Sequence, residues 1–520
     1  MIVITIDTMR ADALGSDTPF LASWARRGVR FLRARTPIPL TLPAHASLLT
    51  GLLPPGHGLR DNTAPPLPAA SRRGFTLLAE EFAQAGYATA AFVASNVLDR
   101  RYGLDAGFSR YEGPPSPTGG EPRFAEIHAP EQADRALRWL AARPKEKPFF
   151  LWVHFFDPHD DYRQFDGDDR RPATAAATDS ARELYAGEVR RVDAALERLL
   201  AGIDPARTVV LVAADHGESL GEHGEATHGH LCYGCTMDIP LLLAGPGVPA
   251  TLEDARACSL VDVAPTLRRL CSLPERGGDG QDLLSPDVPR VIPGESLYAH
   301  RLYGWAQVSA VFDGERSLVD AGPRLEVFDL RRDPQEREAL RRTAGDPGEE
   351  RLERALDAYR ARRGEGGAGG DVENPTPYGS LRRPDEGFLP PVRNRALRDV
   401  VTGLADLPAL YRLRAGVATR EREAVREAMG AVEELARADA GNPALPLELG
   451  RALLLLEEPA LAARALERAW DLGYVAPDLL RLRIAAHLRA SDPEGARRCL
   501  AGARGLVPAA ILEELERLLG

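Results

Sequence analysis

Ile2-Val3-Ile4-Thr5-Ile6, followed at once by Asp7, is the run from which a fold class can be assigned. It is a short, β-branched segment that ends in a carboxylate, as expected for a buried strand. Similar strand-like runs recur at residues 88–93, 149–154, 209–213 and 239–244. Helical patterns lie between or after them, at residues 76–85, 131–142, 180–200 and 263–270. The alternation predicts a layered α/β domain, with ligands at the carboxyl ends of its strands.

The hydrophobic pattern of the sequence changes after residue 300. Two short alternating segments, residues 306–312 and 325–329, predict a small antiparallel subdomain packed on the first. Residues 364–391 are dense in Gly, Pro and charge and are typical of a linker. The sequence therefore predicts three parts: an α/β domain over residues 1–360, a linker over 361–392 and a helical domain over 393–520.

The helical tail contains a repeat of 34 residues. Its matched pairs are Pro443 with Pro477, Leu445 with Leu479, Ala452 with Ala486, Leu454 with Leu488, Pro459 with Pro493, Ala462 with Ala496, Leu466 with Leu500 and Ala469 with Ala503. This period, with small residues where paired helices cross, resembles tetratricopeptide repeats, which bind peptides or proteins. A plain helical bundle is the alternative.

Composition limits the classes of function. The 520 residues are 44% hydrophobic and carry a net charge of -11, which opposes general binding to nucleic acid or anionic lipid. Five cysteines are too few for a disulfide framework, and no apolar run approaches the roughly 20 residues that span a bilayer. The chain opens directly in a strand, so we expect either a cytoplasmic protein or an exported one whose true start lies upstream.

Four polar clusters in the first domain carry chemistry. The first is Asp7 at the end of the opening strand, and the second runs from Pro39 to Gly51, where Pro43 marks the start of a helix. A hydroxyl at that start, Thr41, would face unpaired backbone N–H groups, which suits a nucleophile that attacks a phosphate or sulfate. Taken alone, Asp7 could equally cap the helix or turn that follows, and Thr41 is better explained as a simple helix N-cap.

The third and fourth clusters bring imidazoles and carboxylates together. The third is residues 154–162, His-Phe-Phe-Asp-Pro-His-Asp-Asp-Tyr, and the fourth is residues 214–230, which begins Ala-Asp-His-Gly-Glu. Such ligands bind zinc or hard divalent metals, and Asp215 and His216 can share one ion where the chain turns. A solvated acidic turn is the alternative for the third cluster.

Together these segments resemble the sulfatase family of the alkaline phosphatase superfamily. The resemblance covers roughly residues 1–340 and rests on the opening strand through Asp12, on residues 43–51, on 157–159 and 215–224, and on 86–90 and 328–334. It implies a mixed sheet between helices with a small antiparallel C-terminal subdomain. A sulfatase-like domain followed by tetratricopeptide-type repeats also resembles a bacterial arrangement.

The sequence departs from family sulfatases where sulfate chemistry is performed. Those enzymes place Cys or Ser at the position of Thr41 and oxidise it to formylglycine, which threonine cannot form. Their two sulfate-binding lysines are missing, because this chain has Val93-Ala94 and Thr227-His228 at those places, and Thr8 replaces a family aspartate. A threonine nucleophile resembles instead the nucleotide phosphodiesterase and phosphoethanolamine-transferase branches.

The predicted site contains one or two divalent metal ions, zinc, manganese or calcium, and no formylglycine. Asp7, Asp215 and His216 would bind one ion together with the nucleophile Thr41. His228, Asp157 and His159 would bind a second ion or else the leaving group and phosphoryl oxygens, with Asp161 as a reserve ligand. Two other side chains complete the site: His45, which orients Thr41 or protonates the leaving group, and Asn62, an oxyanion donor.

The predicted function is hydrolysis of a small anionic phosphate monoester or diester. One alternative is a sulfuric ester hydrolase without formylglycine. The other is a degenerate domain whose repeats bind partner proteins.

Overall fold

The computed structural model describes residues 1–62, 67, 74–115, 126–159, 178–286, 288–362, 395, 397–507 and 509–519. They form two compact units. The first contains Met1–Ser296, Val308–Asp320 and the described residues from Leu325 to 362, and the second contains Leu297–Gln307, Ala321–Arg324 and the described residues from 395 onward. The predicted linker lies outside the described residues except for Ala361 and Arg362, so the predicted domain boundaries stay a prediction.

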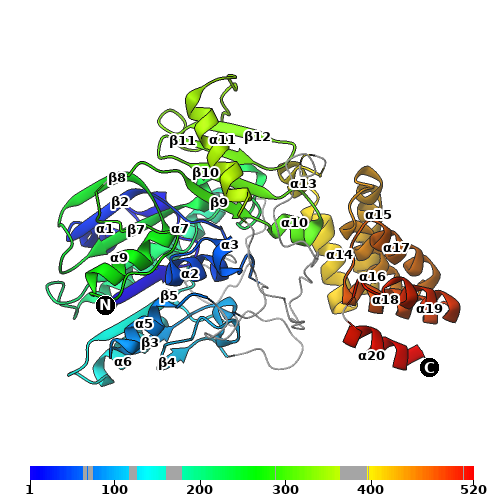
Figure 1. The fold of residues 1–520 in the computed structure, drawn as a ribbon, viewed down its shortest axis with the longest axis horizontal. Coiled ribbons are helices and arrows are strands. Elements are labelled where there is room, and N and C mark those ends of the chain that lie inside the picture. The colour runs from blue at the N-terminus through cyan, green and yellow to red at the C-terminus, as the bar shows by residue number, and fades with distance from the viewer. Residues whose placement is uncertain are drawn as a thin grey trace. The chain divides into compact units, whose positions relative to one another are not determined.

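An eight-stranded mixed sheet forms the centre of the first unit (Figure 1), in the order β4-β3-β5-β1-β6-β7-β2-β8. The strands are β1 (Ile2–Ile6), β2 (Gly28–Arg35), β3 (Ala88–Phe92), β4 (Arg110–Glu112), β5 (Phe149–Phe155), β6 (Val210–Ala214), β7 (Asp238–Ala244) and β8 (Leu252–Ser259). β7 pairs antiparallel with both neighbours, and the other pairs are parallel. The predicted α/β class is confirmed.

Helices pack on this sheet in two groups. α1 (Pro19–Ala25), α6 (Ala129–Ala142) and α7 (Thr178–Leu200) form one chain of contacts. α2 (Thr41–Thr50), α5 (Leu78–Gln84) and α9 (Val263–Leu270) form the other, and α3 (Pro54–His57) and α8 (Gly234–Met237) are single turns. The four predicted helices are α5, α6, α7 and α9, with boundaries shifted by up to two residues except at α9.

The register of the central strands places two carboxylates side by side. Ile6, the last residue of β1, pairs with Ala214 at the end of β6 and with Phe155 at the end of β5. Asp7 and Asp215 are therefore each the first residue beyond neighbouring parallel strands. Since parallel strands end at the same edge of a sheet, the sequence order of these motifs becomes a spatial cluster there.

A four-stranded antiparallel sheet follows, as the sequence predicts. It runs in the order β12-β11-β10-β9. Its strands are β9 (Ile292–Ser296), β10 (Val308–Phe312), β11 (Arg316–Asp320) and β12 (Leu325–Asp329). The helix α11 (Pro347–Arg360) packs on it through Leu352 and Leu356, which are buried among Val311, Leu318 and Val327.

The second unit is helical. Its helices are α10 (Tyr298–Tyr303), α13 (Val400–Leu404), α14 (Leu407–Thr419), α15 (Arg422–Ala438), α16 (Ala444–Leu455), α17 (Pro459–Asp471), α18 (Pro477–Arg489), α19 (Pro493–Gly502) and α20 (Ala509–Leu519). α17 and α19 begin at Pro459 and Pro493, a pair in the predicted repeat, and Gly450 lets α16 approach Leu466 of α17 closely, since a Cβ there would lie 2.5 Å from that side chain. The C-terminal helical region is confirmed, and its assignment to tetratricopeptide repeats stays a prediction.

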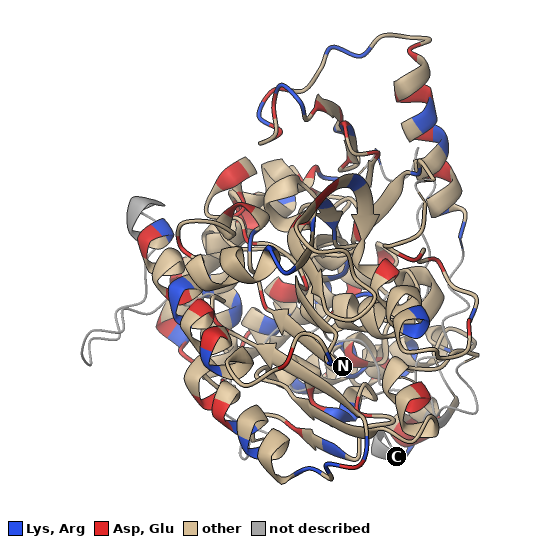
Figure 2. Cartoon of the chain, turned by 90° about the vertical axis from the view of Figure 1, so that its left-hand side faces the viewer, with Lys and Arg blue, Asp and Glu red and all other residues tan. Residues whose placement is uncertain are grey.

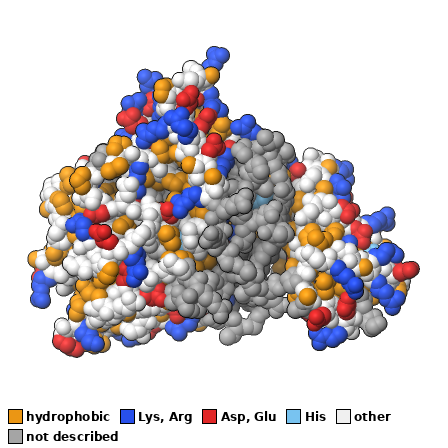
Figure 3. All heavy atoms as spheres, viewed as in Figure 1, with side chains coloured by type: hydrophobic (Ala, Val, Ile, Leu, Met, Phe, Trp, Pro, Cys, Tyr) orange, Lys and Arg blue, Asp and Glu red, His pale blue; other side chains and the backbone are white. Residues whose placement is uncertain are grey.

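Charged side chains of both signs are interspersed over the surface. Figure 2 shows Lys and Arg alternating with Asp and Glu along the helices, and Figure 3 shows the same mixture on the face in view. Within the described part of the chain, none of the helices is long and apolar enough to cross a bilayer.

Candidate active site

Thr41 is the first residue of α2, and its side chain is almost fully buried. Leu40 precedes it in an extended conformation, and Pro43 lies in the first turn, where the lack of an N–H is harmless. The Thr41 hydroxyl therefore lies at the positive end of the helix dipole. Its Oγ1 is 3.5 Å from Asp7 Oδ2 and 3.4 Å from His216 Nε2.

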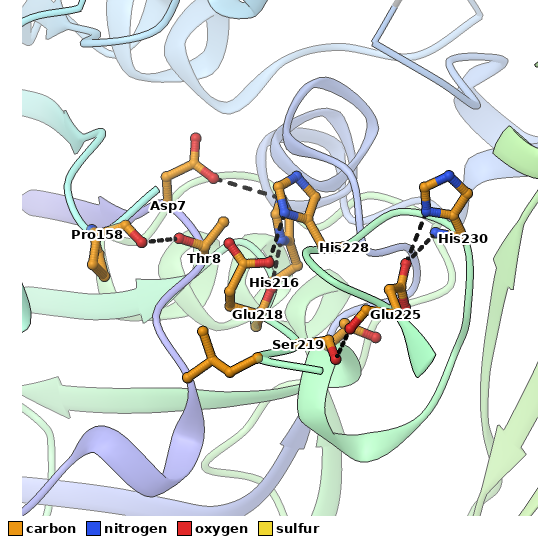
Figure 4. Close-up of polar contacts among 12 residues, drawn as sticks. Asp7, Thr8, Pro158, His216, Glu218, Ser219, Glu225, His228 and His230 are labelled. Atoms are coloured by element: carbon orange, nitrogen blue, oxygen red, sulfur yellow. Dashed lines mark hydrogen bonds and ion pairs between the residues drawn. The ribbon is translucent and has the colours of Figure 1, made fainter. Parts of the chain in front are cut away.

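The two carboxylates of the strand ends are completely buried. Thr8, directly after Asp7, has a φ of 53°, a left-handed conformation that is rare for a β-branched residue. This turn lets the Thr8 N–H donate to Asp215 Oδ1 at 3.3 Å and its hydroxyl donate to Pro158 O at 2.8 Å (Figure 4). The strained turn thus links the segments that follow β1, β5 and β6.

These residues have the composition of a metal site. His216 Nε2 lies 3.5 Å from Asp7 Oδ1 and 3.6 Å from Asp215 Oδ2, and the three ligand atoms of the group all lie within 4.8 Å of one another. Asp7 Oδ1 and Asp215 Oδ2 are buried and have no hydrogen-bond partner among the described residues. Buried carboxylate oxygens without donors are costly unless a cation binds them, so the residues present fit a divalent ion.

Burial sets the protonation of the site in the absence of metal. Desolvation raises the pKa of Asp7, and desolvation followed by repulsion from Asp7 raises the pKa of Asp215 to about 7. Desolvation also lowers the pKa of His216 to about 3, so this imidazole is neutral at pH 7 and its lone pair is available to a metal.

Asn62 contacts the start of the same helix. The backbone N–H of Leu42 donates to Asn62 Oδ1 at 2.9 Å. Since that N–H can only donate, the oxygen of the amide is identified and the NH₂ group is left as a donor. This is the orientation that the predicted oxyanion role requires.

A second group of imidazoles lies beside His216. The His228 ring centroid is 4.5 Å from that of His216 and 5.0 Å from that of His159, which stacks on Phe156. His228 Nδ1 donates to Glu218 Oε1 at 3.0 Å (Figure 4), which directs the Nε2 lone pair away from that carboxylate. Desolvation lowers the pKa of His228 to about 3.

Asp157 is occupied elsewhere. Its Oδ2 accepts the Ala129 N–H at the start of α6 at 2.8 Å, and its Oδ1 is 3.3 Å from His128 Nδ1. Both oxygens thus already have partners, and a ligand role for Asp157 stays a prediction. Asp161 lies outside the described residues.

The structure gives contacts to residues for which the sequence assigned no individual role, although His154 and Glu218 belong to the third and fourth polar clusters. Glu218 supports His228, and His154 approaches Asp7 with Nε2 at 3.5 Å from Oδ2. Thr5 Oγ1 lies 2.9 Å from His45 Nε2, and the Trp152 ring centroid lies 5.2 Å from that of His45. Thr5 is the one polar residue inside the apolar first strand, and this exception is a signal that could have found it.

Comparisons with known proteins agree with this geometry. A family model described as Sulfatase matches residues 1–272. The chain is 23% identical over 396 residues to an endo-4-O-sulfatase of Bacteroides thetaiotaomicron, a match that covers 62% of this chain and 78% of that protein.

Two solved structures have the same fold at low identity. One, in complex with its substrate D-glucosamine-2-N,6-O-disulfate, has a TM-score of 0.57 and 17% identity and is matched over 70% of this chain and 97% of its own. The phosphonate monoester hydrolase of Agrobacterium radiobacter has a TM-score of 0.55 and 20% identity, over 69% of this chain and 94% of its own.

A mixed sheet between helices is thus the fold of this chain and of both solved structures, and here two carboxylates and an imidazole at the central strand ends fit a divalent ion. The family model spans more than half of the 520 residues, and the chain belongs to the sulfatase family.

Proposed function

We propose that this protein hydrolyses phosphorus esters, with Thr41 as the nucleophile and a divalent metal bound by Asp7, Asp215 and His216. The observation that carries the proposal is the position of Thr41 Oγ1, 3.5 Å from Asp7 Oδ2 and 3.4 Å from His216 Nε2 at the N-terminus of α2. A hydroxyl among metal ligands can become a nucleophile at neutral pH, whereas a simple helix cap has no need of such neighbours.

Each residue of the site has its own role in the proposed reaction. A bound divalent ion supplies positive charge that lowers the pKa of a neighbouring hydroxyl and stabilises the charge that develops on the ester oxygens. Thr41 Oγ1 gives up its proton and attacks phosphorus, and the N-terminus of α2 stabilises its alkoxide. The bond from phosphorus to the alcohol oxygen of the ester breaks, and the alcohol leaves with a proton from solvent. Water then cleaves the Thr41–phosphorus bond, which releases the acid product and restores the Thr41 hydroxyl. The Asn62 NH₂ group donates to the phosphoryl oxygens, while its Oδ1 accepts the Leu42 N–H.

The choice of phosphorus over sulfur rests on the chemistry of residue 41. Threonine cannot supply the aldehyde that family sulfatases form from Cys or Ser, so its plain hydroxyl must attack directly. The names of the relatives, an endo-4-O-sulfatase and a phosphonate monoester hydrolase, make both ester classes necessary in a test.

The charge of the site restricts the kinds of phosphorus ester that it can bind. Two carboxylates balance a divalent ion, and Thr227-His228 stand near the place of a family lysine. Burial lowers the pKa of His228 to about 3, so this imidazole is neutral. Little net positive charge is then left for a dianion. We therefore expect monoanionic diesters or phosphonate monoesters to be better substrates than dianionic phosphate monoesters.

The test is a turnover screen of aryl phosphate monoester, phosphodiester, phosphonate monoester and sulfate ester at equal concentration, after incubation with zinc, manganese or calcium. Thr41→Ala should reduce kcat at least about 1,000-fold, as removal of a nucleophile does elsewhere. The matched control is Thr50→Ala, which removes a buried hydroxyl from the same helix that donates to Ala46 O and accepts the Leu52 N–H, away from the metal ligands. It should keep activity within a few-fold of wild type.

Three results would contradict the proposal. One is a wild type that prefers sulfate, which would establish a sulfatase without formylglycine. Another is a Thr41→Ala variant that retains turnover within about tenfold, a difference of only ~1.4 kcal/mol in barrier. The third is a chain that binds well under one metal per molecule and turns over none of the four esters, which would establish a degenerate domain.

A further inference from the structure

Two groups of side chains with metal-ligand chemistry share Asp215. One is Asp7, Asp215 and His216, and the other is His45, His154 and Asp215; in both, the ligand atoms lie within 4.8 Å of one another and all residues are buried. Distance alone therefore allows two ions. The hydrogen-bond partners of the far nitrogen of each ring distinguish the two groups, because a ring nitrogen that carries hydrogen cannot bind a metal.

His216 has the tautomer of a ligand. Its Nδ1 lies 2.9 Å from Gly217 O, and a carbonyl oxygen can only accept, so Nδ1 carries the hydrogen. The neutral ring then presents the Nε2 lone pair to Asp7 and Asp215. This is the usual arrangement of metal-bound histidine, whose other nitrogen donates to a backbone carbonyl or carboxylate.

His154 has the opposite tautomer. The backbone N–H of Ala94 donates to its Nδ1 at 3.2 Å, so this nitrogen must hold the lone pair. In the neutral ring Nε2 carries the hydrogen, and this nitrogen is the one that lies 3.5 Å from Asp7 Oδ2. The side of His154 that faces the carboxylates is therefore an N–H group.

His45 is held by a buried chain of hydrogen bonds. The Trp152 indole N–H donates to Thr5 Oγ1 at 2.9 Å, and the Thr5 hydroxyl donates to His45 Nε2 at 2.9 Å. Nδ1 donates to Thr41 O at 2.7 Å and lies 3.6 Å from Asp215 Oδ2. The residues of this chain are completely buried apart from Thr41, and the nitrogen of His45 nearest the carboxylates is again an N–H group.

We propose that His45 and His154 bind no metal and act as positioning residues. The His45 N–H holds the Thr41 carbonyl at the start of α2, and the His154 N–H, which has no hydrogen-bond partner among the described residues, turns the positive end of its dipole toward Asp7 Oδ2 at 3.5 Å. The proposal rests on the metal site of the proposed function and goes beyond it, since it assigns roles to His154, Thr5 and Trp152. Two carboxylates that share an ion need dipoles to hold them when they are buried, and neutral N–H groups do so without adding charge.

The experiment measures metal binding and histidine tautomers in the full chain, without use of turnover. Mn²⁺ affinity and stoichiometry are measured for wild type, His154→Phe and His154→Gln. The first removes the N–H from a flat ring, and the second restores an N–H near the position of Nε2. We expect His154→Phe to weaken Mn²⁺ binding about 10- to 100-fold at unchanged stoichiometry, and His154→Gln to recover part of the loss.

Ring-¹⁵N NMR of the metal-free protein tests the tautomers directly. We expect hydrogen on Nδ1 of His45 and on Nε2 of His154, with each resonance assigned by the loss of its signal in a single variant. Thr5→Val, which is nearly isosteric, removes the donor to His45 Nε2 but leaves the Thr41 carbonyl as acceptor of Nδ1–H, so His45 should keep its hydrogen on Nδ1. This arm remains informative if His154 variants fold poorly.

Specific outcomes would overturn the inference. One is that His154→Phe loses a whole equivalent of bound metal while the metal that still binds keeps wild-type affinity. Another is unchanged Mn²⁺ affinity in that variant. The third is a set of ring signals that shows a lone pair of His45 or His154 facing the carboxylates. A failure of the phosphoesterase assay would leave these measurements unaffected, so the two proposals can fail separately.

Discussion

Replacement of Asp215 by Asn should stabilise the metal-free protein, by an amount that grows as the pH rises from about 4 to about 7. Burial, followed by repulsion from Asp7, raises the pKa of Asp215 from 3.8 to about 7 in the folded chain. An acid whose pKa is higher in the folded state than in the unfolded state does not affect stability at a pH below its unfolded-state pKa. Above that pH its ionisation destabilises the folded state, and the loss grows until the pH reaches the folded-state pKa. The shift of about three pKa units corresponds to at most about 4 kcal/mol.

The buried histidines also make the unfolding free energy depend on pH, and their effect has the opposite sign to that of Asp215. Desolvation lowers the pKa of His45 and His216 to about 3 and of His154 to about 4, so these residues destabilise the folded protein as the pH falls below 6.5. Their effect opposes that of Asp215 over the same range. The quantity to measure is therefore the difference in unfolding free energy between Asp215→Asn and wild type, in which the histidine contributions largely cancel.

The assay is urea unfolding of chelator-treated protein between pH 5 and pH 8. The advantage of Asp215→Asn should grow by roughly 2 to 3 kcal/mol over this interval and then level off. Asp157→Asn is a matched control, because Asp157 is also buried but accepts a backbone N–H from Ala129. A difference that is flat with pH, or equal in the control, would refute the reasoning. Added divalent metal should stabilise wild type and not Asp215→Asn.

Three further predictions concern other parts of the chain. Asn62→Ala should reduce kcat about 100-fold and leave metal content unchanged, as measured by steady-state kinetics and elemental analysis. Gly217→Ala should cost more than about 2 kcal/mol in unfolding free energy, because a Cβ there would lie 2.3 Å from Cys235 O, and urea melts should record this loss. Limited proteolysis should cut first within residues 364–391 and leave two folded fragments, whereas a first cut inside residues 1–340 would place the boundary elsewhere.

The fold could be predicted where burial makes the pattern simple. β1 matches its predicted range because all five residues are apolar or buried, and β3, β5, β6 and β7 are shifted by one residue at most. β2 and β8 were missed because they lie at one side of the sheet and carry charge, as in Arg30, Arg33 and Arg256. The antiparallel direction of β7 has no sequence signal, since direction depends on the path of the connection and not on side-chain pattern.

Residue type alone predicts some members of the site but not the roles of its histidines. Asp7, Asp215 and Thr41 could be predicted to meet, because strand ends and a helix start converge in this architecture. The roles of the histidines could not, since His45, His154 and His216 have the same side chain and each lies about 3.5 Å from a carboxylate oxygen. What separates them is the far nitrogen of each ring, which meets Thr5, the Ala94 N–H or the Gly217 carbonyl. Those partners are placed by backbone segments distant in sequence, so a ligand and a positioning residue become distinguishable only in three dimensions.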